Sequence, residues 1–530
     1  MDEKRIGTLI CCSSGGTTNV KTVKRLIDYL SLMKYDFLEI CMEDLFQIPE
    51  EPYFGYLRGG YSKEEMHEIV SYGEEKGIEV IPSIQLLAHL KHLLKLPMYW
   101  DVKDIDDILL IGEEKTYELI DHILKTVREY FKTDKVNIGF DEAHKVGLGK
   151  YLDKHGYQNR FNLLCGHLQK VCEIAEKYGF KPHMWSDMFF RLVNKGDYYG
   201  KNLHIPKAVI NKIPSNVGII YWDYYSRDAE MYDSMFKSHL ETKKETWFAT
   251  CAWCHNGFAP QNRLSLYTSE IAFKSLEKYN VNNIIVTLWG DDGNECSFFS
   301  VLPSLFAMKQ FSLGNYDEDK IAKEFEELFG VNYYSFLKLD LPNKTKSNQD
   351  LIKITNPCKS MLYNDCFLGW KDFDIEKEGH IDFEAYSKEL SEIGKEMKEF
   401  KYLFDNLSIL CKALSFKGEL GVKTRKAYKA NNKNELRKLL KQYQQAYIWV
   451  KKFHESFKER WFEDNKPFYW EIHEARLGGL ESRILQCKNR IQMYLKNKIS
   501  RIEELEVEIL PYSDWGLQYN DYLGSISTSS

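Results

Sequence analysis

Two neighbouring acids, Asp141 and Glu142, directly follow the short apolar run VNIGF at residues 136–140. A carboxyl group can give a proton to a reacting group or take one from it, so an adjacent pair is a candidate for acid–base catalysis. An Asp-Glu pair after a strand is also a common cap of the next helix. The residues around the pair leave both interpretations open.

Polar and aromatic residues follow most of the other β-rich runs in the first 300 residues. They are Glu43, Asp44, His89, Trp185, Asp187, Tyr221, Trp222, Asp223, Tyr224, Trp253, Trp289 and Asp291. Taken singly, a tryptophan in such a run is more often core, and a histidine such as His89 more often lies on a helix surface. Aromatic faces stack on the C–H surfaces of sugars, and carboxylates accept hydrogen bonds from sugar hydroxyls. Because all of these residues follow β-rich runs, together they favour a sugar site.

Eight β-rich runs alternate with longer helical patterns up to about residue 310. Apolar runs that are each joined to the next by a helix indicate a parallel sheet covered by helices. Eight such units match a closed barrel better than an open doubly wound sheet, and no GxGxxG motif follows the first run. We therefore predict an α/β fold with a (β/α)8 TIM barrel at residues 1–340, whose site lies at the C-terminal strand ends.

After residue 345 the pattern changes to long charged amphipathic segments such as FEAYSKELSEIGKEMKEFKYLF. This predicts an all-α C-terminal domain at residues 345–530. Within the barrel, adjacent residues of an ideal strand point to opposite faces. Asp141 and Glu142 can reach one cavity only if the strand loses its pleat at the rim, and we expect such an irregularity there.

Composition excludes several classes of function. The net charge of −6 is spread along the chain without a basic stripe, so a nucleic-acid partner is not expected. Neither a secretory signal nor a run of 18 uncharged apolar residues is present, which predicts a cytoplasmic chain without a membrane span. The 12 cysteines are dilute and are expected to be free thiols. Cys254 and His255 lack further ligands at metal spacing, so neither a metal nor a cofactor is predicted.

Several motifs resemble those of glycoside hydrolase family 20, the β-N-acetylhexosaminidases. The likeness runs through nearly the whole chain and is closest to compact bacterial enzymes with a helical C-terminal domain. The motifs are VNIGFDEAHKVGLGKY, KPHMWSDMFFRL, YWDYY, YFGYLRGGYSKEE, ILLIGEEKTYELID and IVTLWGDDGNE. The resemblance implies retaining hydrolysis of β-linked N-acetylhexosamines, in which the 2-acetamido oxygen of the sugar attacks the anomeric carbon.

The resemblance also implies a role for each site residue. Glu142 would be the general acid and then the base, and Asp141 would orient the acetamide and stabilise the oxazolinium ion. Glu43 and His89 would form a supporting relay behind the general acid. The expected sugar contacts are Trp185, Trp253 and Trp289 as pocket walls, Asp291 at the distal O4 or O6 hydroxyl, and Tyr221, Asp223 or Tyr224 near the acetamide.

One family feature is missing at the end of the first strand. Members usually carry an Asp and an Arg there, and this chain has Cys11 and Ser14 at those positions. The reaction type is expected to survive this loss, while specificity changes. A small SSGG loop could leave room for a substituent on O3, O4 or O6, with Arg58 or His255 as new contacts.

Two other functions stay open. The first is a catalytically weak or silent carbohydrate-binding relative, and the second is a biosidase that releases a substituted hexosamine. The expected partner is an oligosaccharide or glycoconjugate substrate. The likeness to dimeric bacterial enzymes also implies a homodimer in which the helical domain shapes the interface.

Overall fold

Eight parallel strands form a closed barrel in the computed structural model, which describes residues 4–13, 15–255, 257–291, 293–511 and 517. Each strand pairs with the next along the chain, and the last pairs with the first. The strands are β1 (Arg5–Cys11), β2 (Phe37–Cys41), β3 (Glu79–Ser83), β6 (Lys135–Asn137), β7 (Lys181–Trp185), β8 (Gly218–Trp222), β9 (Thr246–Cys251) and β10 (Asn283–Leu288). This topology confirms the predicted α/β barrel.

Amphipathic helices cover the outside of the barrel because their apolar stripes pack on the strands. They are α1 (Val20–Leu32), α2 (Lys63–Glu75), α4 (Glu114–Tyr130), α6 (Arg160–Lys177), α9 (Ala229–Leu240) and α10 (Asn262–Leu276), together with the almost fully buried α11 (Leu302–Ser312). Shorter helices lie in the connecting loops: α3 (Lys91–Leu94), α5 (Lys150–His155), which has no buried residue, α7 (Asp187–Val193) and α8 (Lys207–Ile210). The loop after β3 also holds an antiparallel ribbon, β4 (Lys103–Ile105) and β5 (Ile108–Leu109), that the sequence patterns did not predict.

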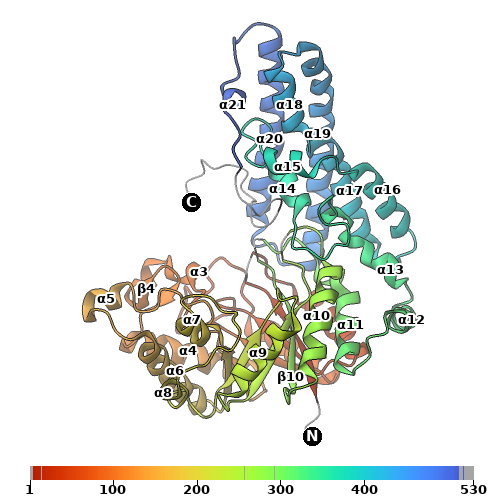
Figure 1. Ribbon diagram of the computed structural model, residues 1–530. Helices are drawn as coiled ribbons and strands as arrows, with labels where there is room; N and C mark the ends of the chain where they lie inside the picture. The colour runs from red at the N-terminus through yellow and green to blue at the C-terminus, as the bar shows by residue number, and fades with distance from the viewer. Residues whose placement is uncertain (1–3, 14, 256, 292, 512–516, 518–530) are drawn as a thin grey trace.

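The C-terminal region is helical, as predicted, and rises from one side of the barrel (Figure 1). Its helices are α12 (Glu318–Phe329), α13 (Tyr333–Phe336), α14 (Pro357–Tyr363), α15 (Asp372–Glu378), α16 (Phe383–Gly394), α17 (Lys401–Lys417), α18 (Leu420–Lys429), α19 (Lys433–Asp464), α20 (Trp470–Leu495) and α21 (Glu503–Glu506). Short 3-10 turns are η1 (Pro97–Val102), η2 (Phe298–Val301), η3 (Leu337–Asn343) and η4 (Lys398–Phe400). The exact domain boundary stays a prediction.

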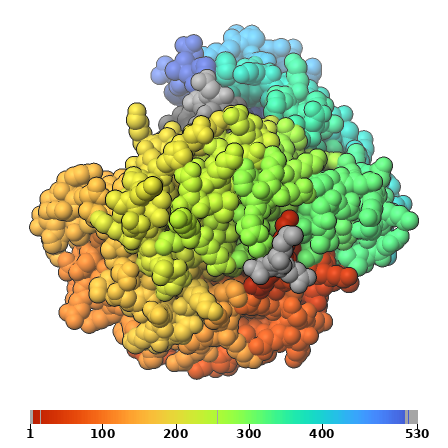
Figure 2. All heavy atoms as spheres, turned by 60° about the horizontal axis from the view of Figure 1, so that its bottom comes forward, coloured from red at the N-terminus to blue at the C-terminus, as the bar shows by residue number. Residues whose placement is uncertain are grey.

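Buried polar contacts fix the helical region to the loop after β10. Lys359 and Glu295 form an ion pair at 2.7 Å whose side chains are each only 1% exposed. Nearby, His473 of α20 donates from Nε2 to the carbonyl oxygen of Gly293 at 2.8 Å. A buried ion pair that lost one partner would leave an uncompensated charge, so these contacts favour one relative placement. Figure 2 shows the red-to-green barrel in front and the blue helical region behind it.

A buried polar network crosses the barrel interior and ends at the point where β6 stops. His183 and Asn137 bond to the two carboxylate oxygens of Glu39, at 2.8 and 3.1 Å. Asn137 Oδ1 in turn accepts from the backbone N–H of Gly139 at 3.1 Å. The last residue of β6 thus fixes the start of the segment that carries the acid pair.

Candidate active site

The chain after β6 leaves the strand conformation before it reaches the acid pair. Gly139 and Phe140 both have φ of +74°, and Glu142 has φ of +52°. A Cβ atom on Gly139 would lie 1.9 Å from Gln85 Oε1, so only glycine fits there without displacing Gln85. The expected loss of pleat is present, and it brings both Asp141 and Glu142 into the wall of one cavity.

Asp141 is held by two side chains from the loop after β3. Gln85 Nε2 donates to Asp141 Oδ1 at 3.0 Å, and His89 Nε2 lies 3.1 Å from Asp141 Oδ2. Burial alone would raise the pKa of Asp141, because it favours the neutral acid. The charge of His89 and the hydrogen bonds from His89 and Gln85 outweigh this effect and hold the pKa of Asp141 below its ordinary value. Asp141 is therefore a carboxylate at neutral pH.

His89 lies closer to Asp141 than to Glu142, whose Oε2 is 3.8 Å from His89 Nε2. Burial lowers the pKa of His89, but Asp141, Glu43 and Glu142 raise it well above its usual range. Burial and the neighbouring Cys11 raise the pKa of Glu43 to about 7, while His89 opposes the rise. His89 thus contacts Asp141 more closely than Glu142, and the relay of Glu43 and His89 behind the general acid stays a prediction.

Three site residues have strained backbones. Glu43 has φ of +50° and His89 has φ of +59°, in addition to the +52° of Glu142. Non-glycine residues rarely adopt this region, and each costs on the order of 1 kcal/mol or more. Such strain persists only where surrounding contacts over-determine it, and it concentrates at functional sites.

A second charged pair supports Glu142 from α7. The N–H of Glu142 donates to Asp187 Oδ2 at 3.1 Å, and Arg191 Nε donates to the same oxygen at 2.9 Å. Arg191 Nη2 also lies 3.4 Å from Glu142 Oε1. Burial and the charge of Asp141 raise the pKa of Asp187 to about 7 against the effect of Arg191. Asp187 was among the strand-end candidates in the sequence, but Arg191 was missed, although the i, i+4 spacing of the two was a signal for this pair.

Aromatic rings form the opposite wall of the cavity, which has a volume of about 170 Å³. Trp185 and Trp289 have ring centroids 5.8 Å apart, and Trp289 Nε1 donates to the Tyr224 hydroxyl at 3.2 Å. The lining residues are Cys41, Glu43, Gln85, His89, Asp141, Glu142, Trp185, Trp222, Tyr224, Tyr225, His255, Trp289 and Asp291. Trp253 is buried behind this wall, where its ring stacks on His255 at 4.6 Å.

Three of the predicted sugar contacts do not line the cavity: Trp253, described above, and Tyr221 and Asp223. Alternate residues of a strand face opposite sides, and Tyr221 on β8 faces the helices, where it stacks on His239 at 4.8 Å. Its hydroxyl donates to Asp223 at 2.8 Å. Asp223 also accepts from the N–H groups of Tyr225 and Ser226 at 3.0 and 2.9 Å. This pair fixes the turn after β8, and Tyr224 is the residue that reaches the cavity.

The end of β1 differs from the expected clamp. Cys11 pairs in register with Cys41 of β2, whose side chain lines the cavity, while Ser14 lies outside the described residues. Arg58, proposed as a new sugar contact, is buried and bonded to Asp44, to the Tyr469 hydroxyl and to the carbonyl of Ser13. It is therefore not part of the cavity wall, because its guanidinium donors point at protein acceptors. His255 does line the cavity, and burial lowers its pKa to about 3.

Comparison with known proteins identifies the family. Residues 17–279 match "Glycosyl hydrolase family 20, catalytic domain", and residues 334–519 match "Glycoside Hydrolase 20C C-terminal domain". The chain belongs to glycoside hydrolase family 20. The family that the sequence motifs indicated is thus confirmed.

Individual members of glycoside hydrolase family 20 are only distantly similar to the chain. It is 26% identical over 190 residues to Beta-hexosaminidase 3 of Arabidopsis thaliana, covering 33% of this chain and 35% of that protein. It is 24% identical over 226 residues to Hexosaminidase D of Homo sapiens, covering 40% of this chain and 43% of that protein. The matches therefore span less than half the length of these relatives.

Solved structures of the family are also similar to this chain. The beta-N-acetylhexosaminidase from Bacteroides fragilis is 20% identical with a TM-score of 0.48, over 62% of this chain and 70% of that one. A Flavobacterium johnsoniae chitobiase is 15% identical with a TM-score of 0.45, over 95% of this chain and 74% of that one.

Three further properties describe this family 20 chain. Within residues 4–511, apart from the three single positions left undescribed, no group of three His, Cys, Asp or Glu side chains has a geometry that could hold a metal ion. The helices of the described part are too short or too polar to cross a membrane. All 12 cysteines are buried free thiols.

Proposed function

We propose that this chain is a glycosidase that removes β-linked N-acetylhexosamine from glycans and uses the substrate's own acetamide as the nucleophile. The observation that supports this most directly is the shared cavity of Asp141 and Glu142, which faces a wall of Trp185, Trp289 and Tyr224. A carboxylate pair that shares a cavity with aromatic rings suits a sugar that carries an N-acyl group.

In this mechanism the acetamide oxygen attacks the anomeric carbon while the bond to the leaving oxygen breaks. Glu142, whose side chain is 42% exposed, gives its proton to that oxygen and then takes a proton from the water that opens the oxazolinium ion. The exposure gives Glu142 access to a leaving group outside the cavity. The net reaction consumes one water and retains the anomeric configuration.

Asp141 has the second role, which needs a fixed negative charge. Its carboxylate would accept a hydrogen bond from the acetamide N–H and stabilise the positive charge of the oxazolinium ion. His89 and Gln85 fix its orientation before substrate binds. Intramolecular attack reaches effective molarities on the order of 10⁵ to 10⁸ M only when the geometry is correct, so this positioning is a large part of the proposed catalysis.

The test compares nitrophenyl N-acetyl-β-glucosaminide and N-acetyl-β-galactosaminide with the same glycosides carrying a free 2-amino group. We expect hydrolysis of an N-acetyl substrate and a large loss of rate without the acetyl group. Glu142→Gln should abolish turnover while the variant still binds N-acetylglucosamine. Equal rates with and without the acetyl group would contradict acetamide participation.

Two finer points are tested by the same assay. A preference for 3- or 4-substituted analogues over the plain sugar would support a biosidase or a modified hexosamine substrate. Sugar binding without turnover of any of these substrates would instead support a catalytically silent relative.

A further inference from the structure

A second cavity lies close to Glu142 and is lined by none of the residues that line the first. It has a volume of about 460 Å³ and is lined by residues from the start of α6 and from α7, two helices that lie on the left of the barrel in Figure 1. His144, two residues after Glu142, and Arg191, 3.4 Å from the Glu142 carboxylate, both line it. The general acid of the proposed mechanism thus lines the first cavity and contacts Arg191 of the second.

The charged residues that line this second cavity are basic. Arg160, Arg191 and Lys195 contribute to its wall, and none of the described lining residues is acidic. In a chain with a net charge of −6, such a cluster is not explained by overall composition. Clefts lined by one sign of charge raise the local concentration of ligands of the opposite sign.

Arg160 differs from the many paired cations elsewhere in the molecule. Its Nη2 group bonds only to the backbone carbonyls of Ala143 and His144, and its Nε is buried without a hydrogen-bond partner among the described residues. Burial lowers the pKa of Arg160, and the weak opposing effect comes from Tyr157 and not from a carboxylate. The Nη1 group of Arg160 forms no hydrogen bond with a described residue, so it can bond an acceptor that a ligand supplies.

Lys195 also lines the cavity, from the loop after α7. It is exposed, it has φ of +55°, and it forms no ion pair with a described residue. Tyr157, which is 71% exposed, adds an aromatic face to the same cavity. Cations together with an exposed ring suit a sugar that carries an acidic group, because the ring stacks on C–H groups and the cations bond the anion.

From this placement we infer that the second cavity binds the leaving-group sugar and selects one with a negative charge, a carboxylate or a sulfate ester. This inference rests on the proposed function, since it assigns the cavity to the aglycone side of the same reaction. Arg160 and Lys195 bond the anion, and Tyr157 supports the sugar ring. Arg191 is shared with Glu142, and its fixed position links aglycone binding to the general acid.

The experiment measures kcat/KM for three disaccharides that differ only in the leaving-group sugar. In one, N-acetylglucosamine is β-linked to glucose; in the others, it is β-linked to glucuronic acid or to 6-sulfated glucose. We expect one or both acidic substrates to be preferred over the neutral one by about tenfold or more, as charge-assisted hydrogen bonds imply. The preference should fall as salt is raised, because screening weakens a partly exposed site.

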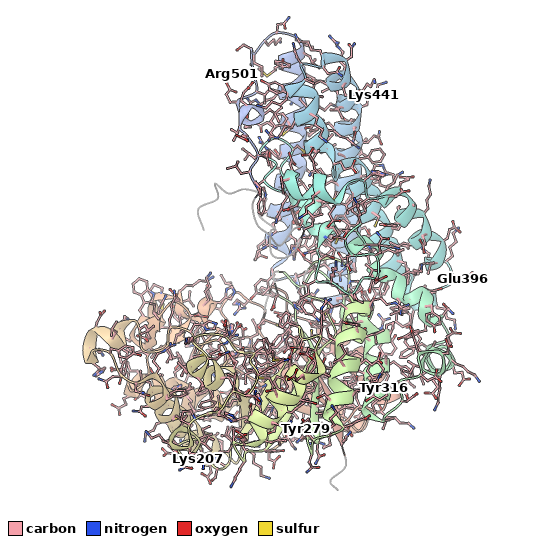
Figure 3. All side chains as sticks on the ribbon, in the orientation of Figure 1. Lys207, Tyr279, Tyr316, Glu396, Lys441 and Arg501 are labelled. Atoms are coloured by element: carbon pink, nitrogen blue, oxygen red, sulfur yellow. The ribbon has the colours of Figure 1, made fainter. Side chains whose placement is uncertain are left out.

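Variants locate the effect in the cavity. Arg160→Gln and Lys195→Gln should each lower the acidic-to-neutral ratio at least about threefold. Lys207→Gln is the matched control, because it removes the same charge from an exposed site on α8, at the far end of the barrel from the helical region (Figure 3). The exposed position of Lys195 keeps the test valid if Arg160→Gln fails to fold.

The outcomes separate this inference from the proposed function. Equal kcat/KM for neutral and acidic disaccharides would overturn the acidic-aglycone site and leave the glycosidase proposal intact. A preference that both variants retain would overturn the assignment to this cavity. If neither the disaccharides nor the nitrophenyl glycosides are cleaved, the proposed function fails and this inference fails with it.

Discussion

The ends of β6 and β8 carry similar polar residues, but these residues have different roles in the structure. After β6, Asp141 and Glu142 follow a segment with positive φ and face an open cavity. After β8, Asp223 is buried, and its carboxylate is bonded to Tyr221 and to two backbone N–H groups. An acid whose hydrogen bonds come from the protein stabilises a turn, whereas an acid that faces a cavity can serve a substrate.

The largest expected effect is the loss of catalysis in Asp141→Asn. The amide keeps the shape of the side chain but removes the charge that would stabilise the oxazolinium ion, so kcat should fall by about 10²- to 10³-fold. Steady-state kinetics on the nitrophenyl glycoside would measure this. Asp223→Asn is the control, and it should lower thermal stability with little change in kcat per folded molecule. A loss of kcat in Asp223→Asn as large as that in Asp141→Asn would contradict the distinction between the two strand ends.

The next effect concerns the backbone that turns the acid pair into the cavity. Gly139→Ala would place a Cβ against Gln85, whose amide bonds to Asp141, so kcat should fall by about 10²-fold. Gly156→Ala is a matched control, because Gly156 also has positive φ, +68°, but has no atom within 4 Å of the added Cβ. The idea is wrong if the two variants lose activity equally.

A moderate effect is expected at the other strand end. Tyr221→Phe leaves Asp223 without one of its buried donors, which should lower the free energy of unfolding by about 1–2 kcal/mol. Tyr224→Phe should instead change kcat/KM more than stability, because Tyr224 lines the cavity. Urea unfolding and kinetics on both variants would test this, and the reverse pattern would contradict it.

The smallest effect is a change in the pH dependence of stability. The folded pKa of Glu43, about 7, is raised above its unfolded value of about 4.5, so its contribution is fully present below pH 4.5 and is lost as pH rises through 7. Glu43→Gln should therefore reduce the fall in stability between pH 5 and pH 7.5 by on the order of 1 kcal/mol. Urea unfolding at both pH values would measure it, and an unchanged pH slope would contradict the raised pKa.

Much of the barrel could be predicted because its determinants are local. Apolar runs and helical periods repeat along the chain, so eight strand–helix units could be read from the sequence, and so could the change to helices after them. The ribbon of β4 and β5 was missed, since two strands of three and two residues carry too little pattern. The site was predicted in part, because the C-terminal strand ends meet at one rim.

Contacts between distant segments were not predictable in the same way. Nothing near Arg58 in sequence indicates that it is bonded to Tyr469, and nothing near Asp141 indicates Gln85 as its donor. The direction of Tyr221 depends on where β8 begins, because a shift of one residue would turn it into the cavity. The second cavity also combines residues from three loops and two helices.

The sequence by itself determined the family, the order of strands and helices, and the presence of an Asp-Glu pair at the end of β6. These depend on residue types and on periods within short segments. Only the tertiary structure decided which acids face a cavity, which are bonded within the protein, and which cations surround the second cavity. Those outcomes depend on backbone angles and packing between segments far apart in the chain, which set burial and hydrogen bonding and thereby the charge that each group carries.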